Sequence, residues 1–104
     1  MSGKLKDGDG DCFRAAFWYA HHHAEEGWVL VHGTAPCGTG GRMGHAWCEM
    51  GDRAFDPTTG GSAMTSEYQA TGVEPRARYT ALEAAQHFLA TKHFGPWEEW
   101  DDLP

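Results

Sequence analysis

Apolar and polar side chains alternate from residue 44 to residue 58, and this alternation predicts a hairpin of two short strands. Gly51 and Asp52 interrupt the alternation and suit the two-residue loop of a tight hairpin turn. With that loop, strand pairing starts at Met50 and Arg53. The register then predicts three further pairs, which are Cys48–Phe55, Trp47–Asp56 and His45–Thr58.

The two faces of this hairpin differ in chemistry, because successive side chains of a strand point to opposite sides. One face is nearly apolar and is predicted to be core; it carries Ala46, Cys48, Met50 and Phe55. The other face carries His45, Trp47, Glu49, Ala54, Asp56 and Thr58. On this second face His45 lies diagonal to Asp56, roughly 7 Å away between backbones, which is within reach of an imidazole–carboxylate hydrogen bond.

A helical spacing of apolar residues begins at Cys12 and continues to about Glu26. Asp11 is the expected N-cap, and Gly27 supplies the stop. The predicted apolar face consists of Phe13, Ala16, Phe17, Ala20 and Ala24. Cys12 therefore lies in the first turn of a helix.

A second helix is predicted after Thr80, which forms a capping box with Glu83. Its predicted apolar stripe consists of Leu82, Ala85, Phe88 and Leu89. Gly95 and Pro96 are expected to end it.

Two more β-rich runs complete the predicted sheet. Residues 28–32 predict a central strand beside the His45 strand, and residues 73–79 predict an edge strand, because Pro75 lacks a backbone N–H. The elements together predict an α+β fold in one domain spanning residues 1–104. Its N-terminal helix carries Cys12 and packs on a small antiparallel sheet, with the C-terminal helix on the sheet's edge or far face.

The glycine-rich stretch from Gly33 to Gly44 leads directly into His45 and has two interpretations. It is either a mobile flap that admits a substrate or an ordinary long hairpin connection. As a flap it would contribute to a substrate-binding surface, for which the predicted residues are Gly41, Arg42, Gly44 and Trp47. Farther along the chain, residues 57–66 are expected to be loop and residues 67–71 a short strand or turn.

Cys12, His45 and Asp56 have the chemistry of covalent acyl transfer. The free amides and the dipole at a helix N-terminus favour a thiolate, so Cys12 is the candidate nucleophile. His45 is the candidate general base, and Asp56 would orient its ring. The Cys12 backbone N–H is the expected oxyanion donor.

The segment His45-Ala46-Trp47-Cys48-Glu49, followed by Phe55-Asp56-Pro57-Thr58, resembles the core motif of the transglutaminase-like branch of the papain-like cysteine peptidase superfamily. The whole chain is also similar to small phage and bacterial proteins with a Gly-Asp-Cys start, a Gly-His-Ala-Trp centre and a Phe-Gly-Pro-Trp end. The resemblance implies a papain-like core and a Cys12–His45–Asp56 triad. It also implies acyl transfer or hydrolysis at an amide or ester of a protein or peptide, as in a peptidase, deamidase or transglutaminase. Papain-like enzymes use a glutamine ahead of the nucleophile as second oxyanion donor, and no glutamine precedes Cys12 here.

Composition narrows the possible partners. The formal net charge of −7 argues against binding a nucleic-acid backbone or an anionic membrane surface. Three cysteines without CxxC spacing favour an intracellular thiol protein in the cytoplasm, or in the host cytoplasm if the chain is phage-encoded. No stretch is apolar enough for a signal peptide or a membrane span. Neither a cofactor nor a metal is expected, because the consecutive histidines 21–23 point about 100° apart on a helix and cannot share one ion.

A non-catalytic member of the same fold that binds and inhibits a partner protein is the alternative function. The small size of the chain, the missing glutamine and the acidic tail with Trp97 and Trp100 favour it. The tail is expected either to pack back on the body or to contact that partner. A metal-binding protein ranks below both functions, because no ligand pair has the required spacing.

Overall fold

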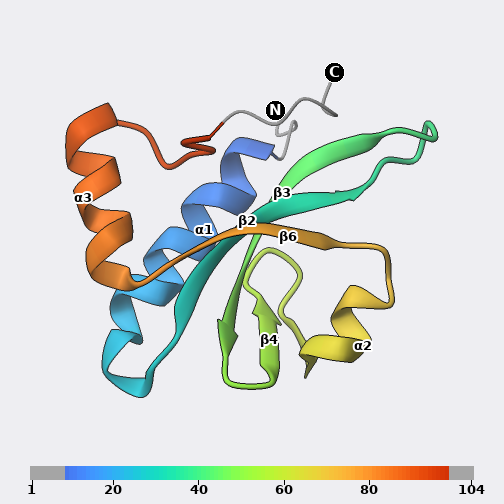
Figure 1. The fold of residues 1–104 in the computed structure, drawn as a ribbon, viewed down its shortest axis with the longest axis horizontal. Helices are drawn as coiled ribbons and strands as arrows, with labels where there is room; N and C mark the ends of the chain where they lie inside the picture. The colour runs from blue at the N-terminus through green and yellow to red at the C-terminus, as the bar shows by residue number, and fades with distance from the viewer. Residues whose placement is uncertain (1–8, 99–104) are drawn as a thin grey trace.

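The computed structural model describes residues 9–98, and these residues form an α+β fold. Within this range a five-stranded antiparallel sheet is combined with three α-helices and one 3₁₀ turn (Figure 1). The elements are α1 (Asp9–His22), η1 (Ala24–Glu26), β2 (Val29–Pro36), β3 (Arg42–Met50), β4 (Arg53–Asp56), β5 (Gly61–Met64), α2 (Thr65–Gln69), β6 (Glu74–Tyr79) and α3 (Ala81–Thr91). The predicted α+β class is confirmed. The part of the acidic tail beyond residue 98, including Trp100, lies outside the described residues.

The sheet has the strand order β5-β4-β3-β2-β6, so β2 and β3 are its central strands. The prediction of a central strand beside the His45 strand is confirmed, because β2 pairs along the length of β3. The predicted edge strand is also confirmed, since β6 pairs with β2 and ends the strand order. Pro75 is tolerated at this position because an edge strand leaves one row of N–H groups unused.

The hairpin register holds at the turn and then stops earlier than expected. Met50 pairs with Arg53 and Cys48 with Phe55, as predicted, but the β3–β4 ladder ends there. The expected pairs Trp47–Asp56 and His45–Thr58 are not part of it. The chain turns away after Asp56, whose carbonyl oxygen accepts a hydrogen bond from the Gly60 N–H at 2.7 Å. This turn leads into β5, so the prediction of loop throughout residues 57–66 is wrong.

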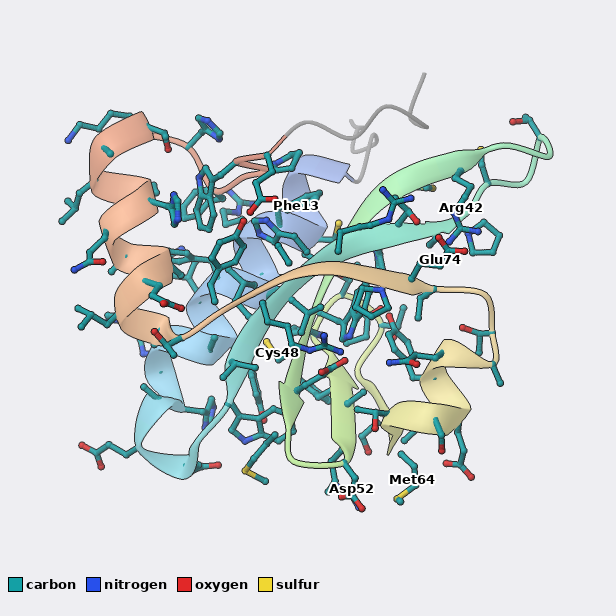
Figure 2. The ribbon with its side chains drawn as sticks, in the orientation of Figure 1. Phe13, Arg42, Cys48, Asp52, Met64 and Glu74 are labelled. Carbon is teal, nitrogen blue, oxygen red and sulfur yellow. The ribbon has the colours of Figure 1, made fainter. Side chains whose placement is uncertain are left out.

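One face of the sheet is covered by α1 and α3. Ala46, Cys48, Met50 and Phe55 all pack in the cluster beneath α1, so the predicted core face of the hairpin is confirmed. Figure 2 labels Cys48 on β3 and Phe13 on α1, and the Cys48 Sγ donates to the carbonyl of Ala16 at 3.2 Å. In Figure 1, α3 lies beside α1, near the β6 edge of the sheet.

The predicted apolar stripe of α3 is confirmed at Phe88 and wrong at its two leucines. Leu82 and Leu89 are 69% and 64% exposed, whereas Ala84 is buried and Phe88 packs against the core. Phe88 lies 5.5 Å from Phe17 between ring centroids, so aromatic contacts with α1 decide which side of the helix faces inward. The capping box of Thr80 is present, with its Oγ1 accepting from the Glu83 N–H at 3.1 Å. The helix ends at Thr91 rather than at Gly95.

The opposite face of the sheet is also apolar and buried. Its core consists of Val31, Trp47, Ala54 and Val73, with Val29, Ala35 and Tyr68 packed against them. Tyr68 comes from α2, a short helix where the sequence predicts a short strand or turn. The strand alternative is therefore wrong, and within residues 67–71 only residues 70 and 71 form a turn.

The glycine-rich stretch is mostly strand, which favours the hairpin connection over the flap. β2 runs to Pro36 and β3 begins at Arg42, so only residues 37–41 connect them, and the two strands form an arm that extends from the body in Figure 1. Gly33 lies at a register shift in this arm. A Cβ there would clash with the Glu74 carbonyl and lie 2.8 Å from the Trp47 ring. Glycine is therefore required where β6 crosses close to β2.

In the described part of the chain, no helix is long and apolar enough to cross a membrane.

Candidate active site

The His45 ring and the Asp56 carboxylate are in direct contact. The His45 Nε2 lies 2.9 Å from Asp56 Oδ2, although the two residues are eleven positions apart. Because side chains alternate between the two faces of a strand, both lie on one face of the β3–β4 hairpin, as predicted. Both side chains are largely removed from water, with exposed fractions of 16% for His45 and 6% for Asp56.

The Asp56 carboxylate is held from both oxygens. Its Oδ1 accepts the Thr58 N–H at 3.0 Å, and its Oδ2 accepts the Tyr68 hydroxyl at 2.8 Å in addition to the His45 ring. Burial opposes ionisation, but the hydrogen bonds from His45 and Tyr68 outweigh it and hold the pKa of Asp56 below its usual range. The carboxylate is therefore a fixed negative charge beside the imidazole.

The His45 imidazole is stabilised in its protonated form. Burial works against the charge, but hydrogen bonds with Asp56 and Cys12 and the negative charges of both groups raise the pKa of His45 to about 9. Because Nε2 is used by Asp56, Nδ1 is the ring nitrogen left for Cys12. A ring held this way at neutral pH is an imidazolium between a carboxylate and a sulfur.

Cys12 reaches this ring from α1, which packs on the other face of the sheet. The β3–β4 ladder ends at Cys48, so β3 has no β4 partner beside His45. At this open edge the His45 ring can contact groups from both faces. Cys12 itself is 4% exposed and belongs to the core cluster beneath α1.

The helix start differs from the prediction. α1 begins at Asp9, so Asp11 lies inside the helix and is not its N-cap. Cys12 is the fourth residue of α1, at the end of the first turn, where the backbone amides pass from free to bonded. The dipole argument for Cys12 and its N–H as oxyanion donor both remain predictions.

Tyr68 is a member of this cluster that sequence reasoning missed. Its hydroxyl lies 2.9 Å from His45 Nε2 and donates to Asp56 at 2.8 Å. Burial and the nearby charge of Asp56 raise the pKa of Tyr68 strongly, so the phenol is neutral. No spacing relative to His45 or Asp56 marks this tyrosine in the sequence, because the contact depends on how β5 and α2 fold back.

The predicted substrate-binding residues do not gather on one surface: Trp47 is in the core, and Arg42 and Gly41 are on the arm. Trp47 is 0% exposed and its Nε1 donates to Glu49 at 3.1 Å, so its prediction as a substrate contact is wrong. The Arg42 guanidinium donates to Thr34 Oγ1 at 2.9 Å and to the Gly72 carbonyl at 2.7 Å. Figure 2 shows it close to Glu74, 3.9 Å away, on the arm.

The two glycines of that set have different surroundings. Gly41 is exposed in the connection, and its carbonyl accepts the Cys37 N–H at 2.8 Å. Gly44 lies in β3, where an added Cβ would meet the Phe13 ring at 3.5 Å. Gly44 is therefore next to the helix that carries Cys12, whereas Gly41 belongs to the tip of the arm.

The other two cysteines are in different environments. Burial raises the pKa of the Cys48 thiol to about 12, consistent with its place on the predicted core face. The Cys37 thiol lies 3.2 Å from the Thr39 hydroxyl at the arm's tip, and that hydrogen bond lowers its pKa. Among residues 9–98, no three potential metal-ligating side chains gather into a site.

Comparison with known proteins adds no further assignment: no protein-family model, no curated protein and no solved structure matches this chain.

Proposed function

We propose that this protein is a cysteine-dependent acyl transferase or hydrolase that uses Cys12, His45 and Asp56. Peptidase, deamidase and transglutaminase activities are included, because all of them pass through the same acyl-thioester. The observation that carries the proposal is the His45 ring, which hydrogen-bonds to Asp56 at 2.9 Å and interacts with the Cys12 side chain. Acyl transfer by a thiol needs an imidazole with one ring nitrogen facing the thiol and the other hydrogen-bonded to a carboxylate.

The chemistry follows from the charges at the site. The Cys12 sulfur attacks the acyl carbon, and the His45 imidazolium, whose pKa is raised to about 9, gives its proton to the leaving amine or alcohol. Acylation then removes the negative charge of Cys12, which is one cause of that raised pKa. In the acyl-enzyme the pKa of His45 is therefore lower than in the free enzyme. The ring, neutral after protonating the leaving group, can then accept a proton from the attacking water or amine.

The arrangement of the elements supports a small papain-like, transglutaminase-like core. The helix carrying Cys12 packs on an antiparallel sheet, and His45 and Asp56 come from the successive strands β3 and β4. The chain order of cysteine, histidine and aspartate matches that branch of the superfamily. The sequence lacks a glutamine before Cys12, so activated esters, whose leaving groups need the least help, are the first substrates to assay.

Alkylation by iodoacetamide tests the proposal without a known substrate. This reagent suits a sulfur that is only 4% exposed, because it is small. The rate at each cysteine is followed by peptide mapping between about pH 5 and 9. At about pH 6, Cys12 should react more than tenfold faster than Cys37, since the His45 ring beside its sulfur, with a pKa raised to about 9, is an imidazolium there.

Two variants of the partners complete the test. His45→Ala should abolish the advantage of Cys12 over Cys37, and Asp56→Asn should reduce it while thermal unfolding shows an intact fold. Cys12→Ala is the mapping control and should remove the fast site. Equal rates at Cys12 and Cys37 across the pH range, unaffected by His45→Ala, would reject the enzyme and favour the non-catalytic partner-binding alternative.

A further inference from the structure

The hydroxyl of Tyr68 closes a ring of three short contacts around His45 and Asp56. The His45 Nε2 lies 2.9 Å from both Asp56 Oδ2 and the Tyr68 hydroxyl, and that hydroxyl lies 2.8 Å from the same Oδ2. A single oxygen of Asp56 therefore accepts from two donors that also touch each other.

Only one distribution of protons satisfies all three contacts. The phenol has one proton, and the acceptor-only carboxylate needs it, so the Tyr68 O–H donates to Asp56. The single Nε2 proton of His45 is then shared between two acceptors, Asp56 Oδ2 and the phenol oxygen. The hydroxyl thus favours the His45 tautomer whose free lone pair is on Nδ1, the nitrogen left for Cys12.

The supports of Tyr68 make this contact rigid. α2 begins directly after β5, where the Met64 N–H donates to the Glu67 carboxylate at 3.1 Å. The Thr65 N–H donates to the Asp52 carbonyl at 2.7 Å, which ties α2 to the β3–β4 turn. On the sheet side the Tyr68 ring packs edge-on against Trp47, with 5.3 Å between centroids. The ring centroid of the buried Trp47 also lies 5.7 Å from that of His45. Trp47 therefore packs against both His45 and Tyr68.

We propose that Tyr68 is a positioning residue of the Cys12–His45–Asp56 site, fixing the protonated Nε2 of His45 and the orientation of the Asp56 carboxylate. The inference rests on the proposed function for its catalytic consequence. Its structural part, the tautomer and the hydrogen-bond geometry, stands on its own. Tyr68 acts through the two residues to which it is hydrogen-bonded, His45 and Asp56.

Loss of the hydroxyl has a definite consequence for pH dependence. Without it, Asp56 Oδ2 loses one of the hydrogen bonds that favour its charged form, so the carboxyl protonates at higher pH. In Tyr68→Phe the acid limb of the Cys12 alkylation profile should therefore move to higher pH.

Tyr79→Phe is the matched control. The Tyr79 hydroxyl also donates to a carboxylate, that of Glu98 at 3.0 Å, but it lies on β6 and has no part in this site. Tyr79→Phe should leave the Cys12 profile unchanged. A wild-type profile in Tyr68→Phe, with thermal unfolding showing a folded protein, would overturn the positioning role.

Nitrogen-15 NMR of the histidine ring separates this inference from the proposed function. In the wild type His45 should be protonated at Nε2 even above the pH at which it becomes neutral, and Tyr68→Phe should weaken this preference measurably, although Asp56 still accepts the Nε2 proton. If the tautomer is fixed by Tyr68 but Cys12 is no more reactive than Cys37, the proposed function fails and the positioning survives. If Tyr68→Phe does not fold, the wild-type Tyr68 hydroxyl proton decides: slow exchange with water supports the hydrogen bond, and fast exchange overturns it.

Discussion

His32 is a buried histidine whose two ring nitrogens have no hydrogen-bond partner within the described residues. It is 0% exposed and lies among aromatic rings, with centroids at 4.7 Å to Phe13, 5.1 Å to Tyr79 and 4.8 Å to Trp97. Gly95 is so close that a side chain there would clash with the His32 ring. Among the described residues, this imidazole is thus surrounded by aromatic rings and has no hydrogen-bonding carboxylate.

The cost of protonating His32 makes stability depend on pH. Burial, reinforced by His87 nearby, lowers the pKa of His32 from 6.5 to about 3. The unfolded chain takes up a proton as pH falls below 6.5, whereas the native state does not until about pH 3. The contribution of neutral His32 to the free energy of unfolding is therefore fully present above pH 6.5 and is lost progressively as pH falls from 6.5 to about 3. Between about pH 7 and 5 the loss from this one group is about 2 kcal/mol.

His32→Leu isolates that loss. Leucine has a similar volume and cannot titrate, so other carboxylates and histidines cancel when the two proteins are compared. Urea unfolding of both at about pH 7 and 5 should show the variant gaining about 2 kcal/mol relative to the wild type on acidification. Whatever the two stabilities are at neutral pH, a stability difference that stays constant between the two pH values would show that the native His32 is protonated or hydrated, and would refute the reasoning.

Three further predictions follow from single positions. Gly33→Ala should lower stability in urea unfolding by about 3 kcal/mol or more, because its Cβ would overlap backbone, whereas Gly41→Ala, with open space around it, should change little. Lys92→Gly should raise the unfolding temperature, with a gain of about 1 kcal/mol, because Lys92 has a φ of 66° at the end of α3. Cys48 should resist iodoacetamide in the native protein at about pH 8 and react on denaturation, since it is buried and far more basic than Cys37.

The local features of the fold could be predicted because each depends on neighbouring residues. The Gly51–Asp52 turn fixes the register of β3 against β4, and parity then places His45 and Asp56 on one face. Pro75 identifies an edge strand from its missing N–H alone. Thr80 and Glu83 satisfy each other's backbone donors at the start of α3.

The errors arise where distant segments meet. Leu82 and Leu89 have the spacing of a buried stripe, but Phe88 packs on Phe17 of α1 and turns them outward. Nothing within residues 57–73 shows that the chain returns as β5 and α2 to place Tyr68 on Asp56. Trp47 likewise belongs to an alternating strand whose second face is buried only because that return covers it.

The meeting of Cys12 with His45 depends on small residues between α1 and β3. Ala16 and Ala20 follow Cys12 at intervals of four, so the three share one side of α1, and all are buried. Opposite them β3 presents Ala46 and Cys48, and the Cys48 sulfur is close enough to bond the Ala16 carbonyl at 3.2 Å. Small side chains on both surfaces let the helix backbone approach the strand closely. The same approach brings Cys12, at the N-terminal end of this stripe, to the open edge of β3 where the His45 ring lies. The close packing of the core and the geometry of the candidate site thus have one cause.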